Sequence, residues 1–520
     1  MLTAPDALPP GLREGPLHRL LGPPRAYALT RFVLMRLLGL VYLAAFASAA
    51  RQLAPLVGPD GLLPANAFLD RVAHLSGSRL EAFRRLPTLL FWLRADNATL
   101  TGLSLFGAVL SLAVTLGLTN AAVQLVLWAL YMSLAHVGQV FYGYGWEIQL
   151  LETGFLSIFL CPLRTLGPLS GPPPPPIVIV LFRWLIVRIM LGAGLIKLRG
   201  DPCWRDLTCL VYHYETQPVP SPLSWLFHQL PASAHKLGVL FNHLVEIVAP
   251  FFAFGPRRAR LVAGGLFIAF QGILILSGNL SFLNWLTIVP AIACLDDDAL
   301  RRLVPARLRA RKGALPAEPT RAHTLVAATL AVIVAFLSIG PVTNLVSPRQ
   351  VMNTSFDPLG LVNTYGAFGS IGRERFEVVL EGTADTVASD EARWLEYELP
   401  CKPGDVRRRP CLITPYHYRL DWQMWFAAQS TLEQEPWLVH LVYRLLRGSP
   451  AVKPLLARDP FPGAPPRFIR ARLYRYRFTR MGDGDPGFWV RALEGEYMRP
   501  LAVDDPALAS YLDARGLSGD

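Results

Sequence analysis

The sequence predicts a multi-pass α-helical membrane domain of about nine transmembrane helices, followed by a non-cytoplasmic α+β domain with antiparallel strands. Three observations support this fold class. Of the 520 residues, 52% are hydrophobic and only 17% are charged, against roughly a quarter in an average soluble protein. Long apolar runs recur through the first two thirds of the chain. After about residue 348 the pattern changes to short alternating segments.

Nine apolar runs approach the roughly 20 residues that a helix needs to cross a bilayer. In chain order they are 32–50, 102–118, 121–140, 148–163, 177–198, 237–254, 261–277, 280–295 and 322–346. The first run can also be read as a signal peptide, because an A-x-A pattern ends at Ala49. The proline-rich stretch before the run, and Arg36 within it, favour an uncleaved anchor.

The basic residues predict the orientation of these helices. The net charge of +12 arises before residue 346, in segments before the first run, between the sixth and seventh, and between the eighth and ninth. With nine crossings all three segments lie on one side, which the positive-inside rule assigns to the cytoplasm. Six arginines contradict this rule by lying outside: Arg51, Arg71, Arg79, Arg84, Arg85 and Arg94.

The predicted domains follow from this topology. They are a cytoplasmic N-terminal segment (1–28), a helical membrane domain (29–346) with lumenal loops 51–101 and 199–236, and a lumenal C-terminal domain (347–520). The basic excess lies beside apolar helices and not on a soluble face, so nucleic-acid binding is not expected. The lipid bilayer is the first expected partner.

Three N-x-S/T sequons fall on the non-cytoplasmic side of this topology. Asn97 and Asn353 are candidate glycosylation sites, whereas Asn279 lies too close to the membrane. Two cysteine pairs also lie outside and are near enough in sequence to form disulfides in an oxidising compartment. The pairs are Cys203 with Cys209 and Cys401 with Cys411. Free, buried thiols are the alternative.

The C-terminal domain combines strands and helices. Alternating patterns predict strands at 376–381, 394–399, 468–478 and 488–493, and helices at 420–429 and 436–446. Gly and Asp residues at 482–487 predict the turn between the last two strands. The domain has about 170 residues and is large enough to fold by itself.

Ionisable residues within apolar runs are functional candidates, because a charge is costly in hydrocarbon. Arg188 and Glu246 lie at matching depths in their predicted helices, at about 1.5 Å per residue. We expect them to form an interhelical ion pair, with His243 one turn from Glu246. This pair can be structural or can serve a proton relay. A metal site using His243 and Glu246 is a weaker possibility.

The loop after the fifth run is rich in polar and aromatic residues, which anchor protein interfaces well. The candidate partner-binding residues are Trp204, Arg205, Asp206, Tyr212, His213, Tyr214 and Glu215. A self-packed cap over the helices is an equal alternative. The sequence lacks the G-x-S-x-G, P-loop, H-E-x-x-H and paired C-x-x-C motifs. No nucleotide or zinc chemistry is therefore expected, and these patterns assign no catalytic residue, cofactor or metal.

Three segments resemble the lipase maturation factor family. They are Leu191-Gly192-Ala193-Gly194-Leu195-Ile196-Lys197, Val362-Asn363-Thr364-Tyr365-Gly366 and Tyr416-His417-Tyr418-Arg419-Leu420-Asp421-Trp422. The resemblance extends from about residue 30 to about residue 501. It implies a multi-pass protein of the endoplasmic-reticulum membrane that helps secreted homodimeric lipases, such as lipoprotein lipase, to fold and dimerise. A bacterial source would place the same topology at an inner membrane with a periplasmic C-terminal domain.

A physical mechanism is compatible with this role. An unassembled lipase subunit exposes apolar surface and strand edges that aggregate unless they are shielded. The alternative is a membrane enzyme whose helical half resembles the vitamin K-dependent γ-carboxylase superfamily and uses Lys197, His243 or Glu246. Alanine substitutions distinguish the two, because an enzyme would lose activity while remaining folded.

Overall fold

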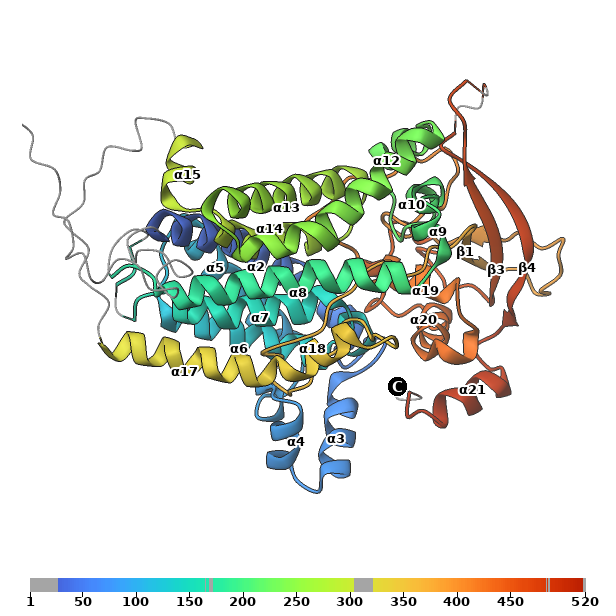
Figure 1. Cartoon of the computed structure of the whole chain (residues 1–520). Coiled ribbons are helices and arrows are strands. Elements are labelled where there is room, and N and C mark those ends of the chain that lie inside the picture. The colour runs from blue at the N-terminus through green and yellow to red at the C-terminus, as the bar shows by residue number, and fades with distance from the viewer. Residues whose placement is uncertain are drawn as a thin grey trace, which may run out of the picture.

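The protein is described from a computed structural model of the whole chain. The structure describes residues 27–163, 165–167, 172–303, 321–482, 484 and 487–517. Most of the expected N-terminal segment 1–28, and most of the basic stretch before the ninth apolar run, lie outside the described residues. The described residues form a bundle of long helices with a sheet at one end (Figure 1).

Helices occupy most of residues 28–346. The helices that form the bundle are α2 (Ala28–Val57), α5 (Asn97–Leu116), α6 (Ala121–Val137), α7 (Gly145–Leu160), α8 (Pro176–Arg199), α12 (Ala232–His243), α13 (Arg257–Ser277), α14 (Leu283–Ala291), α17 (Arg321–Leu337) and α18 (Ile339–Val346). Connecting segments contain α3 (Ala65–Ser76), α4 (Arg79–Arg85), α9 (Pro202–Arg205), α10 (Cys209–Thr216), α11 (Pro222–His228) and α15 (Asp297–Leu303). The expected loop 51–101 is therefore largely helical, since α2 extends to Val57 and α3 and α4 follow.

Each of the nine predicted apolar runs coincides with helical structure, but not every helix has full membrane-spanning length. Among the described residues, six helices are long and apolar enough to cross a membrane. Two shorter apolar helices cover Ala121–Val137 and Leu283–Cys294, and α7 has 16 residues. The six include Ala232–Phe254, in which α12 continues through the π-turn η5 (Leu244–Val248) and the 3-10 turn η6 (Ala249–Phe254).

The first helix begins beside the first residue of α15. Asp297 accepts hydrogen bonds from the backbone N–H groups of Ala28 (3.0 Å), Leu29 (2.9 Å) and Thr30 (3.0 Å). These are donors that a helix N-terminus leaves unsatisfied, and a carboxylate also interacts favourably with the helix dipole there. The start of α2 and residues 295–297 therefore lie at one end of the bundle, opposite the sheet (Figure 1).

The C-terminal part contains one antiparallel sheet of strand order β2-β1-β3-β4. Its elements are β1 (Arg375–Thr383), β2 (Leu395–Glu396), α19 (Arg419–Ala427), α20 (Pro436–Leu446), β3 (Phe468–Phe478), β4 (Trp489–Leu501) and α21 (Pro506–Asp513). The predictions for β3 and α20 are confirmed to the residue. Strand β2 is shorter than predicted. Strand β4 is longer, because it continues past Gly495 and stays paired with β3 through several register shifts.

The two parts of the chain share one core. A single cluster of buried apolar side chains extends from Tyr27 in the bundle to Leu512 in α21. At the junction, Trp146 of α7 stacks on Tyr144 (4.3 Å between ring centroids) and meets Trp422 of α19 edge-on (4.8 Å). Aromatic contacts of this geometry stabilise a core beyond simple burial. The sheet is thus packed onto the helices and not only tethered to them.

Candidate functional site

Buried ion pairs lie where the bundle meets the C-terminal residues. Arg188 of α8 donates to Glu152 of α7 and to the backbone carbonyl of Asn363 (2.8 Å). Glu152 also accepts from the backbone N–H of Asn363 (3.0 Å) and from the hydroxyl of Tyr365 (2.7 Å). A buried charge is tolerated only when it is paired and its remaining hydrogen bonds are satisfied. Residues after the last bundle helix therefore complete the polar interior of the bundle.

The predicted pair of Arg188 with Glu246 is wrong. Glu246 instead accepts from Lys197 Nζ through both carboxylate oxygens (2.5 and 2.6 Å) and from the Asn242 side chain (2.9 Å). Arg188 and Lys197 are nine residues apart on α8, which at about 100° per residue puts them on opposite faces. Arg188 faces α7, whereas Lys197 faces η5. Matching depth therefore did not identify the partner, because it says nothing about the face of the helix.

The Lys197–Glu246 pair holds three elements together. Glu246 lies in the π-turn η5, a type of helix irregularity that is frequent at functional sites. One turn away, His243 Nε2 bonds the backbone carbonyl of Trp204 in α9 (3.0 Å). Lys197 Nζ lies 5.1 Å from the Trp204 ring centroid. The three residues named for the enzyme alternative therefore connect α8, the end of α12, η5 and α9.

A third buried pair joins α19 to the bundle. Arg419, the first residue of α19, donates to Glu147 Oε1 (2.8 Å) and to the carbonyl of Phe141 (2.8 Å). Its backbone N–H donates to Gln52 Oε1 in α2 (2.8 Å). The Tyr131 hydroxyl donates to the same Glu147 carboxylate. The bundle helices α2 and α7, and the turn between α6 and α7, thus bind the first residue of one helix of the C-terminal part.

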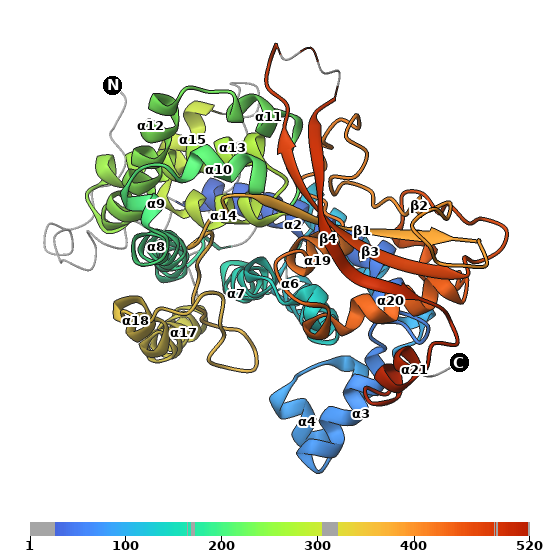
Figure 2. The ribbon, with the colours of Figure 1, turned by 90° about the vertical axis from the view of Figure 1, so that its right-hand side faces the viewer.

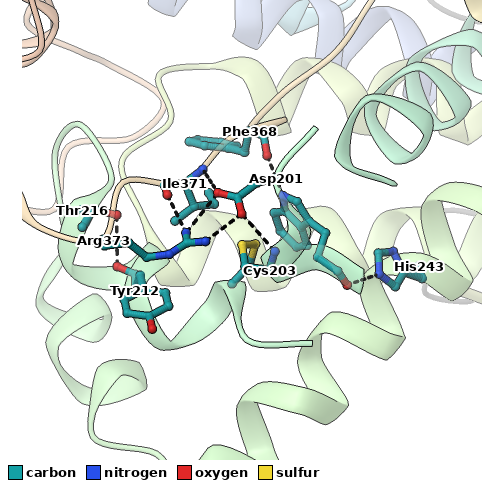
Figure 3. Close-up of a disulfide and its surroundings, with 10 residues drawn as sticks. Asp201, Cys203, Tyr212, Thr216, His243, Phe368, Ile371 and Arg373 are labelled. Carbon is teal, nitrogen blue, oxygen red and sulfur yellow. Dashed lines mark hydrogen bonds and ion pairs between the residues drawn. A yellow bond between two sulfur atoms is a disulfide. The ribbon is translucent and has the colours of Figure 1, made fainter. Parts of the chain in front are cut away.

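The disulfide loop after α8 is fixed from both sides (Figure 3). Cys203 and Cys209 form a disulfide, and Cys401 and Cys411 form a second one. Asp201 accepts from the Cys203 backbone N–H (2.9 Å) and pairs with Arg373 (2.7 Å), whose side chain holds the pKa of this carboxyl below its usual value. Trp204 Nε1 donates to the carbonyl of Phe368 (2.9 Å). Residues 368–373 therefore clamp the loop.

The seven predicted partner-binding residues separate by exposure. Trp204, His213, Tyr214 and Glu215 are at most 9% exposed. Tyr212 is half-buried beneath the guanidinium of Arg373, and Arg205 and Asp206 are exposed. The buried four pack inside the molecule, in agreement with the self-packed cap. Of the seven residues, Arg205 and Asp206 are the two whose side chains are exposed and available to a partner in this conformation.

Arg375 connects the loop to the sheet. This residue starts β1 and is buried with Glu377, to which it is paired at 2.6 Å. Its guanidinium donates to the backbone carbonyls of Glu215 (2.9 Å), Gln217 (2.5 Å) and Pro218 (2.9 Å). Glu377 also pairs with Lys402 (2.6 Å), next to the second disulfide. Both disulfide regions are therefore attached to the same strand.

Several titratable groups outside the membrane-spanning helices have shifted pKa values. Burial, with a contribution from nearby Lys197, lowers the pKa of His213 to about 4. Burial raises the pKa of Glu215 and raises the pKa of Asp421 to about 6. Among the described residues no group of three or more His, Cys, Asp or Glu side chains could hold a metal ion. The loop and the buried pairs are thus suited to holding structure together.

Comparison with known proteins places the chain in a family. Residues 29–302 match the lipase maturation factor transmembrane domain, and residues 361–499 match the lipase maturation factor C-terminal domain. The chain belongs to the lipase maturation factor family. As a member, it has a transmembrane domain with several membrane-spanning helices, followed by the C-terminal domain that contains the sheet.

Named relatives in this family cover nearly the whole chain. It is 50% identical over 513 residues to lipase maturation factor 1 of Bos taurus, covering 94% of this chain and 91% of that protein. Against lipase maturation factor 1 of Homo sapiens the identity is 48%, with 99% and 94% covered. Lipase maturation factor 2 of Gallus gallus is 33% identical, with 92% and 82% covered. No solved structure matches.

The three segments that carried the family resemblance lie at the junction between the bundle and the C-terminal part. The first ends at Lys197, the second contains Asn363 and Tyr365, and the third contains Arg419. The sequence singled out Arg188 and Glu246 but did not identify Glu152 and Lys197 as their partners. It did not predict the Glu147–Arg419 and Asp201–Arg373 pairs. Of these missed residues, Lys197 and Arg419 lie within the family segments, which were the available signal for these two only.

The three sequons of the chain differ in accessibility. The side chains of Asn97 and Asn353 are exposed. Asn279 is buried, and its amide bonds the carbonyl of Cys411 (2.8 Å) and the backbone N–H of Ile413 (3.0 Å). A glycan on Asn279 would require these contacts to break. Burial of Asn279 in the folded chain is thus an argument against this sequon that is independent of its closeness to the membrane.

Proposed function

We propose that this protein is a membrane-bound maturation factor, without catalytic residues of its own, that assists the folding and dimer assembly of secreted homodimeric lipases. The observation that carries the proposal is the similarity to lipase maturation factor 1, at 48% identity over 99% of the chain. The family name implies a lipase client. Exposed apolar surface on an unassembled lipase subunit is the feature that such a factor would cover.

We place the protein in the endoplasmic-reticulum membrane, with nine crossings and the C-terminal domain in the lumen. The basic residues Arg257 and Arg260 lie at the end of the bundle where Asp297 binds the start of α2, and the sheet lies at the other end (Figure 1). This arrangement supports the positive-inside orientation. Two disulfides beside the sheet suit an oxidising lumen.

Glycosylation tests this orientation. We expect endoglycosidase treatment to lower the apparent mass of the full-length protein by removing glycans. This shift in mass should become smaller when Asn97 or Asn353 is replaced by Gln. Asn279→Gln serves as the control and should not change the glycan, because the Asn279 side chain is buried. A full-length protein that carries no glycan and whose C-terminal domain is digested by protease added outside sealed microsomes would contradict the lumenal placement.

The client contact is proposed at the exposed residues of α9 and its end. Arg205 and Asp206 are the exposed members of the predicted loop, and the disulfide holds the turn that presents them. In cells lacking an endogenous factor, we expect Arg205→Ala with Asp206→Ala to lower the yield of active lipoprotein lipase dimer while leaving the thermal midpoint of the factor unchanged. Arg407→Ala with Arg409→Ala, also exposed, is the matched control. Equal yields from both double variants would contradict this contact site.

A further inference from the structure

A helical hairpin projects sideways from the bundle. Helices α3 and α4 run across the direction of α8 and α17, and they point away from the bundle in both views (Figures 1 and 2). Ser78 caps α4 by accepting from the Glu81 backbone N–H (3.1 Å), and Gly77 in a left-handed conformation (φ +79°) ends α3. The hairpin is therefore a defined element and not an irregular loop.

Hydrogen bonds fix the level of this hairpin along the bundle. The Thr88 hydroxyl donates to the Ser133 carbonyl (3.0 Å), and the Leu89 backbone N–H donates to the Ser133 hydroxyl (3.0 Å). The Pro87 carbonyl bonds His136 Nδ1 (2.9 Å). Ser133 and His136 lie in the last turn and a half of α6, next to the end that faces the sheet. The segment after the hairpin is thus held at the outer boundary of an apolar bundle helix.

The surface of this segment combines exposed apolar and basic side chains. Leu75 is 76% exposed, and Trp92 is 58% exposed. The other exposed large apolar side chains are Leu80, Leu89 and Leu93. Residues 65–94 contain five arginines, all exposed, and two acidic residues. Arg84 and Arg85 share one of these, Glu81 (3.3 and 3.5 Å), so the segment keeps a net positive charge.

These properties match a helix that lies in a membrane interface. Such helices have Arg or Lys on one side and Leu or Trp on the other, and they lie in the plane of the headgroups. Trp is enriched at this level, and long basic side chains reach toward phosphate while their apolar stems stay in the bilayer. A protein partner would have to bind at the same level, within the lipid layer around the bundle.

We propose that residues 65–94 form an interfacial hairpin that binds the phospholipid surface of the non-cytoplasmic leaflet. The exposed leucines and Trp92 enter the acyl-chain boundary, and the arginines contact lipid phosphates. This explains the arginines that contradict the positive-inside rule. Five of the six, all except Arg51, belong to this segment, where phosphate compensates their charge. The choice of leaflet rests on the orientation proposed above, whereas the binding of residues 65–94 to a phospholipid surface depends on the transmembrane domain and not on the lipase client.

The test measures the immersion of single sites. The full-length protein carrying Leu75→Cys is labelled with a nitroxide and reconstituted into phosphatidylcholine vesicles. Val387→Cys, on the sheet-containing part and 66% exposed, is the matched control, and the parent chain reports background labelling of the buried Cys161 and Cys294. We expect the Leu75 label to collide with oxygen more than with a water-soluble nickel chelate, and the Val387 label to show the reverse.

Leu93→Cys provides a second site in case the first variant folds poorly. Labels at Leu75 and Leu93 that are as accessible to nickel as the Val387 label would overturn the proposal. Spin–spin broadening at these sites would also overturn it, because a second copy of the chain would then cover the hairpin.

The arginines are tested in the same vesicles. Replacing Arg71, Arg79 and Arg94 by Gln should shift the Leu75 label toward nickel access. The matched variant, with Arg407→Gln and Arg409→Gln on the exposed C-terminal surface, should leave the label unchanged. If the Leu75 label has the same accessibility to oxygen and nickel with and without the three arginine substitutions, the proposed contact of arginine with phosphate is overturned.

Discussion

Single carboxylates hold the junction between the bundle and the C-terminal part. Glu152 receives hydrogen bonds from Arg188, the Asn363 backbone, the Asn363 amide (3.1 Å) and the Tyr365 hydroxyl. Removing one partner of a buried pair costs more than the pair contributes, because an uncompensated charge stays buried. Substitution of Glu152, which accepts hydrogen bonds from several donors, is therefore expected to destabilise the junction strongly.

We predict that Glu152→Ala strongly destabilises the protein. Arg188 is 2% exposed and would lose its counter-ion, at a cost of about 3–5 kcal/mol. The measurement is the thermal midpoint of the purified full chain in detergent. Glu374→Ala is the control, because its partner Arg475 is 41% exposed and keeps a second partner, Glu494, and such a surface pair contributes about 0–1 kcal/mol. Similar midpoints for the two variants would contradict the importance of the buried network.

Asp421 gives a prediction on pH. Its carboxylate accepts from the backbone N–H groups of Cys401 (2.6 Å) and Lys402 (2.7 Å), yet burial raises its pKa to about 6. Between about pH 4 and 6 the folded state therefore holds a proton that the unfolded state has released. The stability contributed by this group falls as pH rises through that window, by at most about 3 kcal/mol.

The comparison is between the parent and Asp421→Asn, which cannot titrate. Buried histidines with lowered pKa values, such as His440 at about 4, act in the opposite direction in the same pH range. Their effect cancels in the difference between the two proteins. We expect the parent to lose stability relative to the variant from pH 4 to pH 6, measured by thermal midpoints. A constant difference would show that Asp421 has an ordinary pKa.

At the scale of single residues, the sequence identified which ionisable side chains are costly to bury in the bundle. It did not identify the residues that pair with them. Depth along a helix follows from the sequence at about 1.5 Å per residue, and Arg188 and Glu246 do lie inside the bundle. The neighbour of each helix face depends on how the helices pack, which no local pattern encodes. The cysteine pairs are different, because six or ten residues of separation leave little choice of partner.

Among the elements, α8 makes the closest approaches to the C-terminal residues. A Cβ atom on Gly192 would lie 2.2 Å from the carbonyl oxygen of Tyr365, and one on Gly200 would lie 2.3 Å from that of Gly369. Gln350 adds a hydrogen bond to the Gly192 carbonyl (2.9 Å). Small residues on this face of α8 thus allow residues 350–369 to lie directly against the helix backbone.

We predict that Gly192→Ala separates α8 from this segment. The added methyl group meets a backbone atom that cannot rotate away, so the cost should resemble overpacking of a core, about 1–3 kcal/mol. Gly265→Ala in α13 is the control, because nothing lies within 4 Å of its added Cβ. That change should be neutral or stabilising by up to about 1 kcal/mol through helix propensity. Thermal midpoints in detergent check both, and equal destabilisation would contradict the close contact.

Helices and strands could be predicted well where the apolar residues follow one clear period, either that of a helix or that of a strand. Strand β3 and helix α20 have clear alternating or helical patterns and matched to the residue. The hairpin α3–α4 was not predicted, because its many arginines and the shortness of its two helices are typical of a loop. Its position across the bundle depends on contacts with α6, such as the bonds to Ser133, that lie 44 or more residues away in sequence.

At the scale of the whole molecule, length suggested that residues 347–520 form an independent domain. In the intact chain these residues share many contacts with the bundle. Gln52, Glu147 and Glu152 of the bundle receive donors from this part, and the apolar core is continuous. Chain length sets whether a core can exist, but it does not show with which residues that core is shared.

We predict that residues 347–520 expressed alone do not fold. Without the bundle, Arg375 and Arg419, which are at most 1% exposed in the intact chain, would lose most of their acceptors, and the faces of Trp422 and Trp146 would separate. Size-exclusion chromatography and near-ultraviolet circular dichroism of the fragment should show an aggregate without fixed aromatic packing. Co-expression with residues 29–346 is the control and should recover a monodisperse complex. A soluble fragment that melts cooperatively by itself would mean that the junction, despite its buried charges, is a dispensable interface between two autonomous domains.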